Sequence, residues 1–282
     1  MAIKIITDST SDIALDRQDE LGIEIVSLSV HFGDKEYVDG VDLTKPQFFQ
    51  MLHDSAELPT TAQVNPERFE KLFEKYRNSG DEVIGIFISG KLSGTYQSAV
   101  IAKQALGAEN IHLIDSLTVS FGLALLVYEM IKLRDAGKTA AEICSAVEEL
   151  KRKQKFYAII DTLKYLKMGG RLSASSAFLG SMLHIKPIVS IENGEIKAFD
   201  KKKGHKAASL RIAEMMEKEK PDPAHRIFFG DTDSPQFLNL LKDAAGSVAD
   251  ISDSEIIALG SVVGTHGGPG CVGVSYIAQG DS

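Results

Sequence analysis

The order in which short apolar runs alternate with helix signals most constrains how this chain folds. In its first half, runs rich in β-branched residues at 3–7, 23–30, 83–88 and 111–114 are separated by longer amphipathic stretches. Strands that are joined by crossover helices pair in parallel and lie under those helices. We therefore predict a largely parallel, helix-covered sheet for the first half.

Helix boundaries can be read between these strands. Thr44 and Gln47 form a capping box with a proline in the first turn, and Asn65-Pro66 begins a second helix. Thr139 and Glu142 form another capping box. Two more helices are expected at 96–106 and 118–136, and the helix that follows Thr139 ends in the basic run 151–155.

The pattern changes after the basic run. Asn193-Gly194 is a strong hairpin signal and joins expected strands at 188–191 and 195–199. The other elements expected here are strands at 156–160, 226–229, 255–259 and 271–277 and helices at 206–219 and after Ser234-Pro235. We therefore predict an α/β protein of two lobes: a mostly parallel lobe over 1–153 and a mixed lobe with a hairpin over 154–282.

Charge and composition exclude several classes of function. The chain has 31 Lys and Arg against 39 Asp and Glu, a net charge of −8, whereas general nucleic-acid binders are basic. Cys144 and Cys271 form neither a disulfide framework nor a Cys-x-x-Cys pair, and the seven histidines are scattered. We predict no metal site, no cofactor and no nucleic-acid partner.

No segment predicts insertion into a membrane. The chain begins with a strand that runs into a polar loop, which does not fit a signal peptide. The longest apolar stretch, 121–133, contains Glu129 and Lys132 and is too short to span a bilayer. We expect a cytoplasmic protein.

Four hydroxyl- or glycine-rich loops adjoin the expected elements, at 7–11, 59–63, 89–95 and 265–270. In open α/β sheets, ligands bind beyond the carboxyl ends of the strands. Ser93, Gly94 and Thr95 offer hydroxyls and backbone N–H groups at the start of a helix, which suits an anion such as a carboxylate. The residues alone thus favour an anion pocket and leave catalysis open.

Two catalytic motifs fail on inspection. The run 85–91 has the glycine and lysine spacing of a phosphate-binding loop, but Leu92 stands where Ser or Thr should hold magnesium. Ser93 is not in the Gly-x-Ser-x-Gly frame of a nucleophile elbow. His266 could activate Ser93, yet the sequence offers no third residue to orient it. An acyl hydrolase or transferase that uses Ser93 and His266 remains the alternative function.

Seven motifs, in order along nearly the whole chain, carry a family resemblance. They are Thr-Asp-Ser-Thr-Ser-Asp at 7–12, Leu-Pro-Thr-Thr-Ala-Gln at 58–63, Ile-Ser-Gly-Lys-Leu-Ser-Gly-Thr-Tyr-Gln-Ser-Ala at 88–99, Ile-Asp-Ser at 114–116, Leu-Lys-Tyr-Leu-Lys-Met-Gly-Gly-Arg-Leu at 163–172, Ile-Lys-Pro at 185–187 and His-Gly-Gly-Pro-Gly at 266–270. The chain resembles the DegV family of bacterial fatty-acid-binding proteins.

The resemblance implies a lipid-binding protein that is not an enzyme by itself. It would hold one long-chain fatty acid, such as palmitate, with the carboxylate between the lobes and the tail in a tunnel of the second lobe. Thr61 and Ser93 would donate hydroxyls to the carboxylate, with N–H groups near Gly94 and with His266 beside them. Relatives present the fatty acid to a separate ATP-dependent kinase that makes acyl phosphate.

Other details follow from this resemblance. The apolar segments 178–183 and 159–160, with Leu163, could wall the tunnel. Two departures from the family pattern bear on the site and its partner. Ala62 replaces a common serine, and lysines at 201–203 replace an arginine linked to kinase docking. A binder of small polar ligands with the same fold would instead need a short polar pocket.

Overall fold

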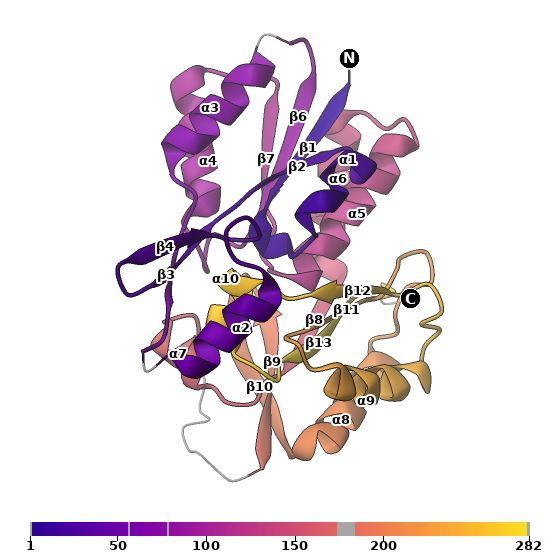
Figure 1. Ribbon diagram of the computed structural model, residues 1–282. Coiled ribbons are helices and arrows are strands. Elements are labelled where there is room, and N and C mark those ends of the chain that lie inside the picture. The colour runs from indigo at the N-terminus through magenta and orange to yellow at the C-terminus, as the bar shows by residue number, and fades with distance from the viewer. Residues whose placement is uncertain (1, 56, 78, 174–183, 281–282) are drawn as a thin grey trace.

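The computed structural model describes residues 2–55, 57–77, 79–173 and 184–280. Two sheets with helices packed against them stand one above the other in Figure 1. The first is entirely parallel, with strand order β2-β1-β6-β7. Its strands are β1 (Ile3–Asp8), β2 (Ile23–Val26), β6 (Glu82–Phe87) and β7 (Ile111–Asp115). The predicted parallel sheet of the first half is confirmed.

Helices cover both faces of this sheet. One face carries α3 (Pro66–Arg77) and α4 (Thr95–Leu106), and the other carries α5 (Phe121–Asp135) and α6 (Ala140–Lys153) (Figure 1). The short η1 (Ser9–Ser11), η2 (Leu15–Arg17) and α1 (Gln18–Leu21) link β1 to β2. The predicted capping box of Thr139 and Glu142 is present.

The prediction of one strand over 23–30 is wrong. β2 ends at Val26, and the chain then enters a separate antiparallel sheet of order β4-β3-β5. The strands of that sheet are β3 (Ser29–Phe32), β4 (Lys35–Val38) and β5 (Thr60–Ala62). Leu28 causes the break, because its N–H donates to the Ser9 hydroxyl (3.1 Å) and its carbonyl accepts from the N–H of Asp39 (2.9 Å). Between β4 and β5 lies α2 (Lys45–Asp54), with the predicted capping box of Thr44 and Gln47.

The second half forms a mixed sheet of order β10-β9-β8-β13-β11-β12. Its strands are β8 (Gln154–Ile159), β9 (Ile185–Glu192), β10 (Glu195–Lys203), β11 (Phe228–Asp231), β12 (Glu255–Ala258) and β13 (Val272–Ile277). β11 and β12 are parallel, and the other neighbours are antiparallel. Asn193 and Gly194 both have positive φ, at 52° and 83°, as the predicted tight hairpin requires.

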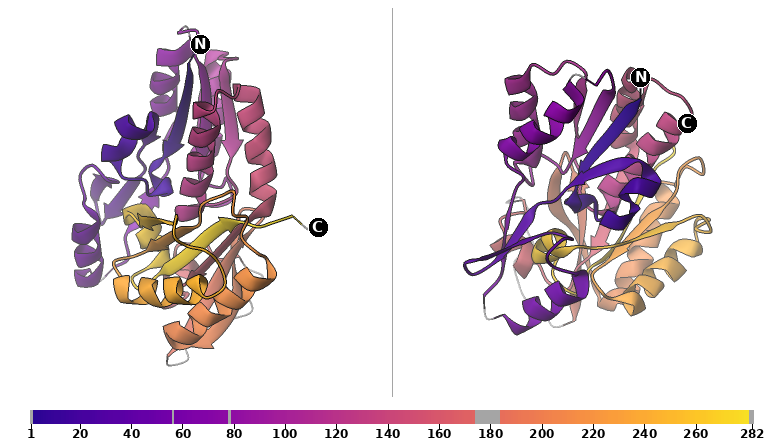
Figure 2. Two further views of the ribbon diagram at one scale, coloured as in Figure 1. Left: turned by 90° about the vertical axis from the view of Figure 1, so that its right-hand side faces the viewer. Right: turned by 45° about the horizontal axis from the view of Figure 1, so that its top comes forward.

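Two helices, α8 (Gly204–Lys218) and α9 (Pro235–Gly246), pack on the outer face of this sheet (Figure 2). Ser234 holds the N-cap position of α9 as predicted, but its hydroxyl donates to the Thr232 carbonyl instead of capping the helix. Two short helices, α7 (Lys164–Met168) and α10 (Ser261–Gly267), pack against each other, and α10 also contacts α2, β3 and β5.

The long helix α5 joins the cores of the two halves. It is buried along most of its length and packs on β1 as well as on β11 and β13. It begins at Phe121 and not at residue 118, because Ser120 is its N-cap with φ +56°. One continuous cluster of buried apolar side chains thus runs from the parallel sheet into the mixed one. In the described part of the chain, no helix is both long and apolar enough to span a bilayer.

Candidate functional site

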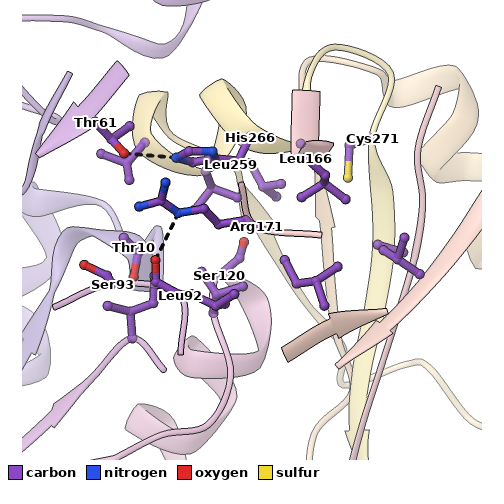
Figure 3. A pocket seen from close by; sticks show the side chains of 18 of the residues that line it. Thr10, Thr61, Leu92, Ser93, Ser120, Leu166, Arg171, Leu259, His266 and Cys271 are labelled. Atoms are coloured by element: carbon purple, nitrogen blue, oxygen red, sulfur yellow. Dashed lines mark hydrogen bonds between the residues drawn. The ribbon is translucent and has the colours of Figure 1, made fainter. Parts of the chain in front are cut away.

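The candidate site is a cavity between the two sheets whose walls come from both halves of the chain. Its lining includes all four residues that the sequence singled out: Thr61, Ser93, Gly94 and His266. Figure 3 shows His266 and Arg171 at the centre of the view, with Thr61 and Ser93 to the left and Leu166 and Cys271 to the right. Polar groups therefore gather around one part of the cavity.

Thr61 and His266 are in direct contact. Thr61 lies in β5, which pairs with β3 through Val30, and the Thr61 hydroxyl is 2.9 Å from Nε2 of His266 (Figure 3). The sequence placed both residues in loops, and this is corrected: Thr61 is on a strand, and His266 is in the last turn of α10. Regular elements hold both side chains more firmly than loops would.

His266 is uncharged at neutral pH. Burial, with a further contribution from the positive charge of Arg171, lowers its pKa to about 4. Part of its ring surface is open to the cavity, yet Nδ1 is buried and has no hydrogen-bond partner among the described residues. Nδ1 lies directly against the backbone of Gly169, where a Cβ would overlap it. A neutral His266 can take part in one hydrogen bond through Nε2 but adds no charge.

Arg171 supplies the charge that the sequence analysis did not assign. Its Nε donates to the carbonyl of Leu92 (3.1 Å; Figure 3), and its Nη1 donates to the carbonyl of Gly169 (2.5 Å). These two bonds fix the guanidinium in the cavity wall, and Nη2 has no bond to a described residue. The motif at 163–172 contains this arginine directly after Gly169 and Gly170. A cation in such a motif, in a chain predicted to have an anion pocket, was the sequence signal that could have identified it.

Ser93 and Gly94 lead into α4 at the same part of the cavity. The Ser93 hydroxyl is 3.0 Å from the Thr95 hydroxyl and accepts a bond from the Thr95 N–H (3.3 Å). Gly94 is the N-cap of α4, and a Cβ there would overlap the side-chain amide of Gln63. Gln63 also lines the cavity and donates to the hydroxyl of Ser98 (2.9 Å). The predicted hydroxyl and helix N-terminus are thus at the cavity.

Thr10 is a further cavity residue, but its hydroxyl is already bonded. It donates to Oδ1 of Asp8 (2.5 Å), whose Oδ2 accepts from the N–H of Ile88 (2.8 Å). Asp8 therefore joins the ends of β1 and β6 beneath the cavity. Burial raises the pKa of Asp8 to about 6 and outweighs these hydrogen bonds, which lower it.

Two further buried carboxylates hold the start of α10. Oδ1 of Asp12 accepts from the N–H of Gly260 (2.7 Å), and Oδ1 of Asp39 accepts from both the N–H (3.2 Å) and the hydroxyl (2.5 Å) of Ser261. Burial raises the pKa of Asp12 to about 7, while Lys45 and the Ser120 hydroxyl lower it. These contacts fix the helix that carries His266.

Apart from Ser120 and Gly267, the rest of the cavity wall is apolar, and it comes from several elements, among them the mixed sheet, α5, α7 and α10. It includes Leu28, Ile88, Leu92, Val119, Phe121, Phe156, Ala158, Ile160, Leu166, Val189, Ile196, Leu259, Val262, Val263 and Cys271. Of the segments expected to wall a tunnel, Ile160 lines the cavity, whereas Ile159 packs in the core on the opposite face, beneath α8 and α9. Leu163 packs against the core cluster, and 178–183 lie outside the described residues.

Ser93 and His266 are not hydrogen-bonded to each other, as the alternative hydrolase or transferase would require. His266 bonds to Thr61, and the Ser93 hydroxyl bonds to Thr95. The run 85–91 does not form a phosphate-binding loop, because its first glycine, Gly85, lies inside β6. Glycine is needed there for packing, since a Cβ would lie 2.8 Å from the Phe87 ring and 2.9 Å from the Leu113 side chain. Among the described residues, no three His, Cys, Asp or Glu side chains gather as metal ligands would. The arrangement is suited to holding a carboxylate beside an apolar chain.

Comparisons with known proteins agree with this picture. The family described as "Uncharacterised protein, DegV family" matches residues 2–279. A DegV domain-containing protein of Caldanaerobacter subterraneus is 38% identical over 275 residues, which is 97% of this chain and 98% of that protein.

Two solved structures are similar over almost the full length. One is of a fatty-acid-binding DegV family protein from Thermus thermophilus, with a TM-score of 0.90, 30% identity and coverage of 99% of this chain and 100% of that one. The other, a stearic-acid-binding protein from Eubacterium ventriosum, has a TM-score of 0.87, 26% identity and coverage of 99% and 98%. This chain belongs to the DegV family.

Proposed function

We propose that this protein binds one long-chain fatty acid in the cavity between its sheets. The carboxylate would lie among Thr61, Ser93, Gly94, Arg171 and His266, and the tail would run along the apolar wall. The observation that carries the proposal is that one cavity contains both a fixed guanidinium and an extensive apolar wall. Fatty-acid binding by the Thermus thermophilus relative supports it.

The energetics assign separate roles to the two parts of the site. Burial of a CH₂ group contributes ~0.8 kcal/mol, so a sixteen-carbon tail contributes roughly 10 kcal/mol before ordering costs. A carboxylate that leaves water without donors costs several kcal/mol. The charge of Arg171 and the hydroxyls of Thr61 and Ser93 offset that cost. Affinity thus comes mainly from the tail, and the polar groups set its direction.

We propose further that the protein is a carrier in the cytoplasm and not an enzyme by itself. It would present the carboxylate to a separate ATP-dependent kinase, which phosphorylates it. Two features support this: the run 85–91 offers no nucleotide loop, and the His266–Thr61 pair leaves Ser93 without a base. The exposed Lys201 and Lys203 would keep positive charge at the docking surface in place of an arginine.

Native mass spectrometry of protein purified without added lipid, followed by organic extraction, tests the proposal. We expect one bound mass of about 250–290 Da, in the range of long-chain fatty acids. The proposal of fatty-acid binding is wrong if the purified protein is empty and also binds no palmitate in a titration. A panel of acyl esters tests the alternative hydrolase, which requires turnover that is lost in Ser93→Ala.

A further inference from the structure

Phe156 borders both the fatty-acid cavity and a second hollow on the surface. This second hollow, which we call the hairpin groove, is lined by the Ser116–Thr118 turn, by the α6 side chains Glu148, Lys151 and Arg152, by Gln154 and by hairpin residues 191–193. Phe156 lines both spaces, and it is the only residue of the described ranges to do so. Phe156 therefore borders both an apolar cavity and a polar groove.

The position of Phe156 on β8 puts it at the end of the wall that is remote from the carboxylate-binding groups. Phe156, Ala158 and Ile160 alternate along the chain and all face the cavity. After Ile160 the chain continues toward Leu166 and Arg171, so Ile160 is nearest to the polar part. Ile160 follows Phe156 by four positions, a distance of about 13 Å along an extended chain.

The Phe156 ring is held in place on two sides. It stacks on the ring of Phe121, with centroids 4.4 Å apart and planes inclined by 5°. On another side it approaches Gly122, where a Cβ would lie 3.0 Å from the ring. Phe156 is only 8% exposed and Phe121 1% exposed, so neither ring has solvent into which it can turn.

Phe121 is itself fixed by two glycines of the mixed sheet. A Cβ at Gly230 in β11 or at Gly273 in β13 would overlap its ring. Glycine at both positions lets the ring lie directly on the strands. The stack therefore rests on backbone, which cannot give way as flexible side chains do.

We propose that Phe156 closes the far end of the fatty-acid cavity and so sets the longest acyl chain that the protein accepts. This inference rests on the proposed function. A chain that outgrows the cavity would have to break the stack with Phe121 or leave its terminal carbons unburied. Removal of the ring would open a passage into the hairpin groove, where longer chains could continue toward Lys151 and Arg152.

The test compares the wild type with Phe156→Ala and Phe156→Leu in titrations with saturated fatty acids of fourteen to twenty-two carbons. In the wild type, affinity should rise with length and then fall. In Phe156→Ala, the affinity for the twenty-carbon acid relative to the sixteen-carbon acid should rise at least tenfold. Phe156→Leu, which keeps a smaller wall, should shift the same ratio less.

Phe229→Ala is the matched control. Phe229 is fully buried in β11 but packs on the opposite face of the sheet and lines neither space. The same truncation there should lower stability without moving the chain-length preference. Circular dichroism spectra and melting curves establish whether each variant is folded. If Phe156→Ala does not fold, the comparison is made with Phe156→Leu alone.

A second probe reports on the passage itself. Docosanedioic acid carries a carboxylate at each end, and a closed apolar end must reject the second one. Phe156→Ala should bind it at least ten times more tightly than the wild type does, because the groove beyond is polar. An unchanged length profile in a folded variant that binds palmitate overturns this inference alone. A wild type that binds no fatty acid overturns the proposed function and this inference together.

Discussion

Oδ1 of Asp39 accepts two hydrogen bonds from Ser261, one from its N–H (3.2 Å) and one from its hydroxyl (2.5 Å). Ser261 is the first residue of α10, and His266 lies in the last turn of the same seven-residue helix. Since Asp12 holds the preceding N–H of Gly260, both carboxylates fix the end of α10 that is opposite to His266. The contact of His266 with Thr61 therefore depends on residues outside the cavity wall.

Replacement of Asp39 tests this dependence. Asp39→Leu leaves the buried N–H and hydroxyl of Ser261 without an acceptor, which costs ~1–3 kcal/mol of unfolding free energy. Asp39→Asn keeps a carbonyl oxygen at this place and should lose less. Urea unfolding measures both variants. If the two lose equal stability, the hydrogen bonds to Ser261 do not hold the helix.

Arg171 should be the strongest polar determinant of fatty-acid binding. Arg171→Met keeps much of the side-chain volume but removes the charge, and we expect binding to weaken by ~1.5–3 kcal/mol, as for a lost bond to a charged group. The affinity of Arg171→Lys should lie between those of the wild type and Arg171→Met, because lysine keeps the charge but lacks the planar guanidinium. Titration with palmitate measures the loss. Palmitate methyl ester is the control, since its uncharged head should bind the wild type and Arg171→Met alike.

The two hydroxyls at the cavity should also contribute to fatty-acid binding. Ser93→Ala and Thr61→Val are each expected to weaken fatty-acid binding by ~1–3 kcal/mol, the cost of a carboxylate oxygen left without a donor. Unchanged affinity in both variants would mean that the carboxylate lies elsewhere.

His266→Ala should reduce acyl-phosphate formation with the kinase more than it reduces fatty-acid binding. Equal losses in the two assays would contradict this role of His266.

The parallel sheet and the hairpin could be predicted because their signals are local. Runs such as Ile3–Asp8 repeat apolar residues within a few positions, and Asn193-Gly194 specifies its turn by itself. α10 has no such signal. Its start is held by Asp12 and Asp39, which are 248 and 222 residues away, so no local capping residue marks it. The strands β3, β4 and β5 have only three or four residues each, too few for a period to be read.

The site could be predicted only in part, for a related reason. Thr61 and His266 are 205 residues apart, so no spacing connects them, and the family resemblance brought them together. Arg171 was missed because its role follows from two backbone carbonyls, those of Leu92 and Gly169, that turn it into the cavity. The low pKa of His266 likewise depends on burial and on Arg171, neither of which a sequence displays.

The buried carboxylates should make stability depend on pH. Burial raises the pKa of Asp12 to about 7 and that of Asp8 to about 6 from an ordinary 3.8, so the folded state binds more protons than the unfolded state in this range. The unfolding free energy should therefore fall as pH rises from about 4 to about 7. His266 acts in the opposite sense: its pKa is lowered from 6.5 to about 4, so its contribution to stability grows as pH rises between these values.

Asp12→Asn separates these opposing effects, because it removes one titrating group and keeps an acceptor for the N–H of Gly260. Relative to this variant, the wild type should lose roughly 1–4 kcal/mol of unfolding free energy between pH 4 and pH 8, since one pKa unit corresponds to about 1.4 kcal/mol. Urea unfolding at several pH values measures the difference. Asp34→Asn is the control for the loss of one carboxylate, because Asp34 is exposed in the turn before β4 and its surroundings are unlike those of the buried carboxylates. A wild type and Asp12→Asn that respond identically to pH would mean that Asp12 is ionised throughout this range, with Lys45 compensating for its burial.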